Sequence, residues 1–332
     1  MSTHYRLIGS IALALTSVFS SGDCVPLFAD AGAFASAMGG IRFRKESRIS
    51  MEKERLTISE RKVTAEYEFL NNTDKDITIG LAFPLPDATC NALYALPKET
   101  IFDSSLSFHV WADGKELRYS TETKALDNDG HKDYTNFLQE LGANVASCST
   151  PATLSHEDRQ KLVASGLAYR EGNDPAGAVV PFWTVREKYY WTQTFPAHRT
   201  VFLKNEYKPF PGWQELELGK DVDSRVREAT LEGSRADRRD SCLGPRLLKK
   251  LTELTEHGGY IRFGFVDYIL MTANYWNGPI KDFELIVEKP PGVYVSFCWE
   301  GPVERLDKSH FRATAHNFAP KRNLEISFSY PE

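Results

Sequence analysis

The feature that most constrains the fold of this chain is a strict alternation of apolar and polar side chains in two neighbouring stretches. The first runs from Val63 to Phe69 and the second from Ile77 to Phe83. Successive side chains of a strand point to opposite faces, so a period of two predicts strands with one buried face. Residues 71–75, between the two stretches, are rich in Asn and Asp, which favour turns. We therefore predict a hairpin over residues 63–83.

Further strand patterns occur along most of the chain. They lie at residues 106–110, 117–119, 188–194, 200–207, 260–270, 283–287, 293–298, 311–315 and 324–328. Apolar side chains at helical spacing predict helices at residues 134–141 and 247–254. Ser155 followed by Asp158 resembles a capping pair and predicts another helix that runs to about residue 165. Aromatic residues make up 12% of the chain, and such side chains suit a half-buried sheet. Several strands with one apolar face need a second layer, so we predict a mainly-β (α+β) fold built of β-sandwich domains.

The length of 332 residues predicts about two domains. We place a signal peptide over residues 1–31 and an N-terminal β-sandwich over residues 32–212. A helical insertion interrupts that sandwich at about residues 127–180, where helical spacing replaces alternation. Residues 213–332 are predicted to hold a connector helix and a C-terminal β-rich domain.

The N-terminus predicts export from the cytoplasm. An apolar stretch of about 13 residues, Leu7 to Phe19, follows Arg6, and a membrane-spanning helix needs about 20 such residues. Small residues follow, and we expect the mature chain to begin between Asp23 and Gly32. A lipid anchor at Cys24 and a buried N-terminal helix are the alternatives. The expected location is the bacterial periplasm or the extracellular space, with no transmembrane anchor after leader removal.

The cysteine content fits an oxidising compartment. Removal of the leader leaves Cys90, Cys148, Cys242 and Cys298, an even number without the paired spacing of a zinc site. Four cysteines allow three pairings. We predict one bridge in each half of the chain, Cys90 with Cys148 and Cys242 with Cys298. A free catalytic cysteine is the alternative.

Charge and motifs argue against several classes of protein. Forty Lys and Arg stand against 45 Asp and Glu, a net charge of −5, so we predict no nucleic-acid partner. His156 and Glu157 begin like a zinc-protease helix, but Gln160 stands where the second histidine ligand belongs. The chain carries neither a serine-hydrolase elbow nor a phosphate-binding glycine loop. We therefore predict no metal, no cofactor and no catalytic residues.

Two groups of residues are candidates for ligand binding. Asn274 and Trp276 lie in the most distinctive loop of the chain, residues 274–280, and Trp183 and Trp191 lie in a stretch rich in aromatic residues. Exposed aromatic rings stack on sugars or anchor partner proteins. The alternative interpretation is structural, with the tryptophans in the core and Gly278 and Pro279 shaping a turn.

Several ordered segments resemble a bacterial exported family, domain of unknown function 4424. These segments are Met38–Ile41, Tyr67–Pro86, Phe195–Pro209, and Thr272–Ile280 with Asp282 and Phe283. The resemblance also implies the bridge between Cys242 and Cys298, because the family pattern has one cysteine before a helix and one in a Ser-Phe-Cys strand. Cys90 and the insertion that carries Cys148 depart from that pattern. A fainter resemblance, over residues 62–207 without the insertion, is to the vault/inter-alpha-trypsin-type β-sandwich, which is associated with protein contacts.

Export, cysteine parity and the missing catalytic motifs favour a binding protein over an enzyme. We predict an exported β-sandwich protein that binds a protein or envelope ligand through loops and exposed aromatic side chains. The alternative is a secreted hydrolase whose active site is assembled from distant residues, which one sequence does not reveal.

Overall fold

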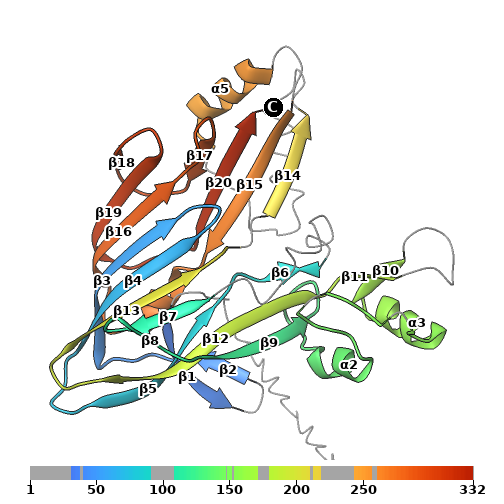
Figure 1. Ribbon diagram of the computed structural model, residues 1–332, viewed down its shortest axis with the longest axis horizontal. Coiled ribbons are helices and arrows are strands. Elements are labelled where there is room, and N and C mark those ends of the chain that lie inside the picture. The colour runs from blue at the N-terminus through green and yellow to red at the C-terminus, as the bar shows by residue number, and fades with distance from the viewer. Residues whose placement is uncertain are drawn as a thin grey trace, which may run out of the picture.

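The computed structural model shows a mainly-β protein, as the alternation predicts (Figure 1). It describes residues 31–37, 40–90, 108–146, 148–151, 153–170, 179–209, 212–217, 243–255 and 260–331. The predicted signal peptide and Cys242 lie outside the described residues, apart from Ala31 at the end of the former. No helix within the described ranges is long and apolar enough to span a membrane.

A long sheet contains eight strands, in the order β18-β19-β16-β3-β4-β13-β7-β8. Its strands are β3 (Ile49–Ile58), β4 (Val63–Asn71), β7 (His109–Ala112), β8 (Lys115–Glu116), β13 (Thr200–Tyr207), β16 (Ile280–Glu288), β18 (Val303–Arg305) and β19 (His310–Phe318). β3 and β16 pair in parallel, and the other neighbours are antiparallel. The sheet therefore takes strands from both sides of the boundary predicted at residue 212.

Two smaller sheets accompany the long one. The six-stranded sheet contains β1 (Gly32–Ala37), β2 (Gly40–Phe43), β5 (Ile77–Pro84), β6 (Ala88–Thr89), β9 (Ser120–Leu126) and β12 (Thr184–Phe195). The four-stranded sheet contains β14 (Gly212–Glu217), β15 (Tyr260–Tyr268), β17 (Tyr294–Phe297) and β20 (Leu324–Pro331). Helix α5 (Pro245–Thr255) packs its apolar side on β15, with Leu251 buried beside Ile261 and Phe263. The short 3-10 helix η3 (Met271–Tyr275) follows β15.

Both smaller sheets pack on one face of the long sheet. Phe69 of β4 contacts Phe195 of the six-stranded sheet, with ring centroids 6.0 Å apart. Tyr67, two residues earlier on the same face, meets Tyr268 of the four-stranded sheet, with 2.9 Å between the hydroxyl oxygens. Phe83 of the six-stranded sheet also contacts Tyr268. One continuous apolar core therefore joins the three sheets, and the predicted division at residue 212 does not coincide with a division between sheets.

The predicted hairpin over residues 63–83 is wrong, although both of its strands are present. β4 pairs with β3 and β13 in the long sheet, whereas β5 pairs with β1 and β12 in the six-stranded sheet. The chain thus crosses from one layer to the other between the two strands. The return predicted after the Asp113-Gly114 turn is present but short: β8 pairs with β7, and the Leu117 N–H donates to the Val110 carbonyl. The chain then crosses to the other layer, where β9 pairs with β12. Alternation reports which face of a strand is buried, but not the layer that buries it.

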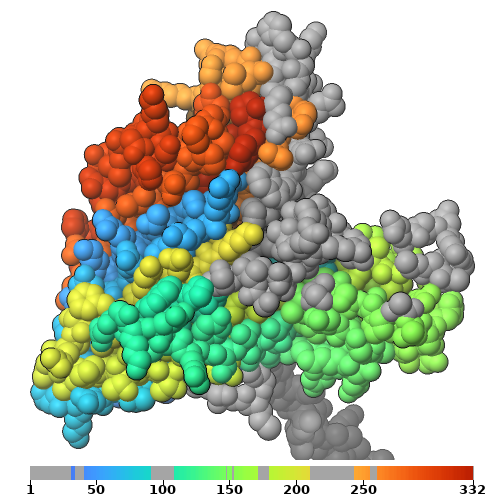
Figure 2. Space-filling view, viewed as in Figure 1, coloured from blue at the N-terminus to red at the C-terminus, as the bar shows by residue number. Residues whose placement is uncertain are grey.

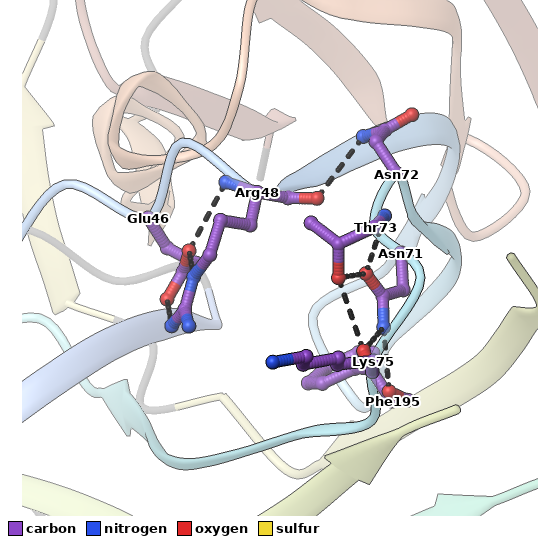
Figure 3. A network of polar contacts seen from close by, with 7 residues as sticks. All are labelled: Glu46, Arg48, Asn71, Asn72, Thr73, Lys75 and Phe195. Atoms are coloured by element: carbon purple, nitrogen blue, oxygen red, sulfur yellow. Dashed lines mark hydrogen bonds and ion pairs between the residues drawn. The ribbon is translucent and has the colours of Figure 1, made fainter. Parts of the chain in front are cut away.

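A network of polar contacts holds the crossing between β4 and β5 (Figure 3). The Asn71 amide nitrogen donates to the backbone carbonyls of Lys75, at 2.8 Å, and Phe195, at 2.9 Å. Its side-chain oxygen accepts from the backbone N–H and the hydroxyl of Thr73. Phe195 ends β12, which also crosses between layers, so one buried asparagine ties the two crossings together.

The helical insertion is present and has a core of its own. It contains α2 (Thr135–Glu140), α3 (His156–Ala164), and the paired strands β10 (Ala168–Arg170) and β11 (Val179–Pro181). Ser155 caps α3 by accepting a hydrogen bond from the Asp158 backbone N–H, the predicted capping pair. The insertion projects from the end of the six-stranded sheet, away from β16, β18 and β19 (Figure 1). Trp183 is the largest buried side chain of this second core.

The disulfide predicted in the first half of the chain is present. Cys90 and Cys148 are bonded across 58 residues, which fastens the insertion to the end of the six-stranded sheet. Cys298 is also disulfide-bonded. Its predicted partner, Cys242, lies outside the described residues, so that pairing stays a prediction.

Candidate functional site

A groove of about 410 Å³ lies on the outer face of the long sheet, the face that the smaller sheets leave uncovered. Side chains of β3, β4, β13 and β7 line it, and Gly114, in the turn between β7 and β8, lies at one end. In the space-filling view these strands follow one another as blue, yellow and blue-green bands below the orange and red strands (Figure 2). We take this groove as the candidate functional site.

The register of the sheet arranges the groove side chains in two rows that cross the strands. In the first row Lys53 lies opposite Glu68, and Glu68 lies opposite Phe202. In the second row Arg55 lies opposite Glu66, Glu66 opposite Lys204, and Lys204 opposite Trp111. Thus β3 presents cations and β4 presents carboxylates, whereas β13 presents one aromatic ring and one cation, and β7 presents an aromatic ring.

Two of the groove cations are held by carboxylates at its margins. Arg55 Nε lies 2.6 Å from Glu284 on β16, and this hydrogen bond raises the pKa of the guanidinium. Lys204 Nζ lies 3.2 Å from Glu206. Burial acts to raise the pKa of the Glu206 carboxyl, but the hydrogen bond and positive charge of Lys204 act more strongly. The pKa of Glu206 therefore lies below its ordinary value.

The two carboxylates in the middle of the groove, Glu66 and Glu68, do not form such close ion pairs. No ion pair or hydrogen bond is formed by Glu66 or Glu68 with any described residue. Lys53 likewise has no ion pair within 4 Å in the described part of the chain. Glu66 nevertheless lies between Arg55 and Lys204 in the register of the sheet, and its negative charge contributes to the raised pKa of Arg55.

Aromatic rings supply the apolar part of the groove. Phe202 is 55% exposed, which is unusual for a phenylalanine in the middle of a strand. Trp111 is half-buried, with the ammonium of Lys204 4.8 Å from its ring centroid and the ring of His109 stacked at 5.6 Å. A cation over an aromatic face is attracted by the ring quadrupole. This end of the groove therefore already binds one cation of the protein itself.

The turn after β7 keeps this end of the groove open. Asp113 and Gly114 both have positive φ, 48° and 79°, which is the two-residue hairpin turn that an Asp-Gly pair favours. Asp113 fixes the turn to β13, since its backbone N–H donates to the Phe202 carbonyl and its side chain accepts from the Phe202 N–H. Gly114 has open space where a side chain would lie.

Three of the four residues proposed for binding from the sequence lie in the interior. Trp276 is fully buried against Phe69, 4.5 Å between ring centroids, and its indole N–H donates to the Ala31 carbonyl. Trp183 is fully buried in the core of the insertion and donates to the Val145 carbonyl. Trp191 is nearly buried between the six-stranded sheet and the long sheet.

Asn274 is the exposed member of that set. Its side-chain nitrogen donates to the Pro320 carbonyl, and its own backbone carbonyl accepts from the Lys45 ammonium at 2.9 Å. Both contacts tie η3 to neighbouring loops. The structure does not bring Asn274 to the groove, and the binding role of the four residues stays a prediction.

Sequence reasoning missed the groove residues. Glu68, Phe202 and Lys204 lie within the segments that carry the family resemblance, but at positions that the alternation marks as polar and outward-facing. One signal was available: Phe202 is an aromatic residue at an outward position, between the inward-facing Val201 and Leu203. A single exposed apolar side chain is common on protein surfaces, so this signal gains meaning only together with the other groove residues.

Metal binding has no support in the described part of the chain, where no group of three or more histidine, cysteine or acidic side chains could hold an ion. Exposed histidines instead form single pairs with carboxylates, as in His198 with Asp74 at 2.5 Å and His316 with Asp282 at 2.5 Å.

The fold and the groove define a mainly-β protein with an open, aromatic and charged surface site. A family model, Domain of unknown function (DUF4424), matches residues 29–327, and the chain therefore belongs to this family. A comparison with curated proteins gave no match.

Comparison with solved structures gave distant likenesses. One is a Legionella pneumophila protein described as a candidate nutrient binding protein, with 15% identity and a TM-score of 0.40, covering 91% of this chain and 70% of that chain. Another is yeast LTA4 hydrolase in complex with bestatin, with 10% identity and a TM-score of 0.33, covering 89% of this chain and 31% of that enzyme. Both TM-scores lie below 0.5, too low to transfer a function.

Proposed function

We propose that this protein is an exported binding protein that holds a protein or envelope ligand in the groove on the outer face of its long sheet. The observation that carries the proposal is the exposed Phe202, which lines the same groove as Trp111 together with several charged side chains. Aromatic anchors surrounded by a polar rim are typical of binding surfaces. The residues that form the groove come from rigid paired strands, which suits recognition without rearrangement.

The disulfide between Cys90 and Cys148 supports the proposed location outside the cytoplasm. Such bonds form and persist in the periplasm and in secreted proteins, and are rare where glutathione keeps thiols reduced. The choice between periplasm and extracellular space stays open in this proposal.

The form of the groove favours binding over the alternative, hydrolysis. Glu66 and Glu68 lie two residues apart on the same face of β4, toward solvent. A hydrolase needs an acid and a base placed on opposite sides of a scissile bond, in a site that excludes water. Two carboxylates on one strand of an open face flank a ligand from one side only.

A thermal-shift screen tests the proposal. The oxidised, full-length protein is heated with glycans, lipids, metal ions, peptides and envelope extracts, because a ligand that binds only the native state raises the melting temperature. Each hit is then repeated with Phe202→Ser. The matched control is Val303→Ser, which removes an apolar side chain with 43% exposure from β18, at the far edge of the same sheet.

We expect the ligand to stabilise the wild type and the Val303→Ser variant, and to lose most of its effect on Phe202→Ser. A ligand that stabilises all three proteins equally would place binding elsewhere and refute the role of the groove. The alternative function would gain support if the wild-type protein instead released hydrolysis products from one of the hits, and if the Glu66→Gln variant did not.

A further inference from the structure

We propose that the leader of this protein is removed by hydrolysis of the peptide bond between Gly22 and Asp23, so that the mature chain keeps Ala31 as part of its core. The inference rests on the export that we propose, and it concerns a processing site that is separate from the groove. It places the cut earlier than the boundary predicted from the sequence at residue 31.

Two triplets near the N-terminus have small side chains at the first and third positions before a bond, the pattern that a signal peptidase cuts. One is Ser20-Ser21-Gly22 and the other is Ala29-Asp30-Ala31. The second has alanine at both positions and is the better match to the pattern. A cut there would make Gly32 the first residue of the mature chain.

Ala31 lies in the interior of the protein. Ala31 and Ala33 are both fully buried and belong to the core that the three sheets share. Gly32 is buried as well, and it begins β1, which pairs with β5 so that Gly32 lies opposite Ala82 (Figure 1). The bond between Ala31 and Gly32 therefore belongs to the packed part of the molecule. The match of the family model also includes Ala31, since it begins at residue 29.

The carbonyl of Ala31 has a specific hydrogen-bond partner. It accepts from the indole N–H of Trp276 at 2.9 Å, and Trp276 is fully buried against Phe69. A cut after Ala31 would release this carbonyl with the leader and deprive the buried indole N–H of its acceptor. Because a buried donor without an acceptor is unfavourable, such a cut would destabilise the fold.

The charge that cleavage creates gives a second reason. Hydrolysis of a peptide bond consumes one water molecule and leaves a carboxylate on the released leader and an ammonium on the new first residue. A cut after Ala31 would place this ammonium on the buried Gly32, and moving a charge from water into an apolar core is strongly unfavourable. A cut after Gly22 places it on Asp23, with residues 24–30 between it and Ala31.

N-terminal sequencing and the intact mass of the exported wild-type protein test the inference. The protein is expressed with its own leader in a bacterial host and is recovered from the periplasm and the medium. We expect Asp23 as the first residue. Any other first residue would overturn the assignment, whether Gly32 or a lipid-modified Cys24.

A matched pair of variants locates the cut. Gly22→Leu places a large side chain directly before the proposed bond, and Ala29→Leu places one at the third position before the bond that follows Ala31. We expect Gly22→Leu to lose most of its mature product and to accumulate as precursor, whereas Ala29→Leu should still begin at Asp23. The opposite pattern would overturn the inference.

Melting temperatures test its structural basis. Chains that begin at Asp23, Leu27 and Gly32 are released from a cleavable fusion and oxidised, and the first two keep Ala31. We expect these two to melt alike, and the chain from Gly32 to melt at least about 5 °C lower or to lack a cooperative transition. Equal melting temperatures for all three chains would contradict the role of Ala31.

Failure of this inference is distinguishable from failure of the proposed function. An exported protein that begins at another residue refutes the cleavage site alone and leaves the groove as the candidate binding site. A precursor that keeps its leader inside the cell refutes the export on which both proposals depend.

Discussion

Asn71 is the residue on which the connection between layers depends. It is fully buried, and its side chain makes four hydrogen bonds that fix the crossings after β4 and before β13. An alanine there would deprive the buried Phe195 carbonyl of this donor, which costs about 1–3 kcal/mol, and would remove the acceptor of the Thr73 N–H and hydroxyl.

Asn71→Ala should therefore lower the free energy of unfolding by about 3 kcal/mol in urea denaturation. Asn72→Ala is the matched control, because Asn72 is exposed and should cost under about 1 kcal/mol. Similar losses in the two variants would show that the Asn71 network is not what secures the crossing.

Glu46 gives a pH dependence with a defined sign. It accepts two side-chain hydrogen bonds from Arg48, at 2.8 and 2.6 Å, and these lower the pKa of its carboxyl against the opposing effect of burial. A carboxyl whose pKa is lower in the folded state stabilises the fold above its unfolded pKa of about 4.3. That contribution disappears as the pH falls through the lowered folded pKa.

Glu46→Gln should thus be less stable than the wild type at pH 7, and the difference should shrink below about pH 4. Urea unfolding of both proteins between pH 7 and pH 3 measures it. A difference that stays constant over this range would mean that the ionised carboxylate of Glu46 contributes nothing.

Among the elements, the helical insertion depends most on a single covalent bond. The disulfide closes a loop between Cys90 and Cys148, 58 residues apart, and the loop-entropy model gives about 4 kcal/mol for a loop of this size. The second core that it fastens is small and separate from the main one.

Replacing both cysteines by serine should accelerate amide hydrogen exchange in α2, α3, β10 and β11 by about 100-fold or more. The amides of β3 and β4, in the centre of the long sheet, serve as the internal control and should keep their protection. Unchanged exchange in the insertion would show that its own packing suffices.

The positions of the strands and helices were largely predictable from the sequence, but the pairing of the strands was not. Alternation located β4 and β5, and the capping pair at Ser155 located α3, because these patterns are local. Pairing is non-local, and the turn-rich residues 71–75 fit a hairpin as well as a crossing between layers. The Asn71 side chain decides between the two by binding Phe195, 124 residues away.

At the scale of the whole molecule, the parallel pairing of β3 with β16 joins the two halves of the chain. Leu56 and Leu285 face each other across this pairing, and both are buried in the core shared by the three sheets. The N-terminal half alone would therefore expose one edge of β3 and the apolar face that the four-stranded sheet covers.

A fragment of residues 31–212 should consequently aggregate or remain without fixed tertiary structure, as measured by near-ultraviolet circular dichroism and by NMR dispersion. The full chain, prepared in parallel, should show a cooperative melting transition. A soluble fragment with its own cooperative transition would mean that the N-terminal half is an independent domain.

The groove is also a property of the whole molecule, and for this reason it is not evident from the sequence. Its side chains come from four strands spread from Lys53 to Lys204, and only the sheet register places them in two rows. Trp276 was a more conspicuous candidate in the sequence, yet it fills the core. Phe202 differs from a core residue only in its outward register position, which is visible once its strand is assigned.

The most direct measurement is site-specific photo-crosslinking in cells that export the protein. A photoreactive phenylalanine analogue replaces Phe202 in one version and Val303 in another, and adducts are analysed by mass spectrometry. The account predicts a discrete adduct from position 202 and none from position 303. Adducts of equal yield from both positions, or none from position 202, would contradict a binding site in the groove.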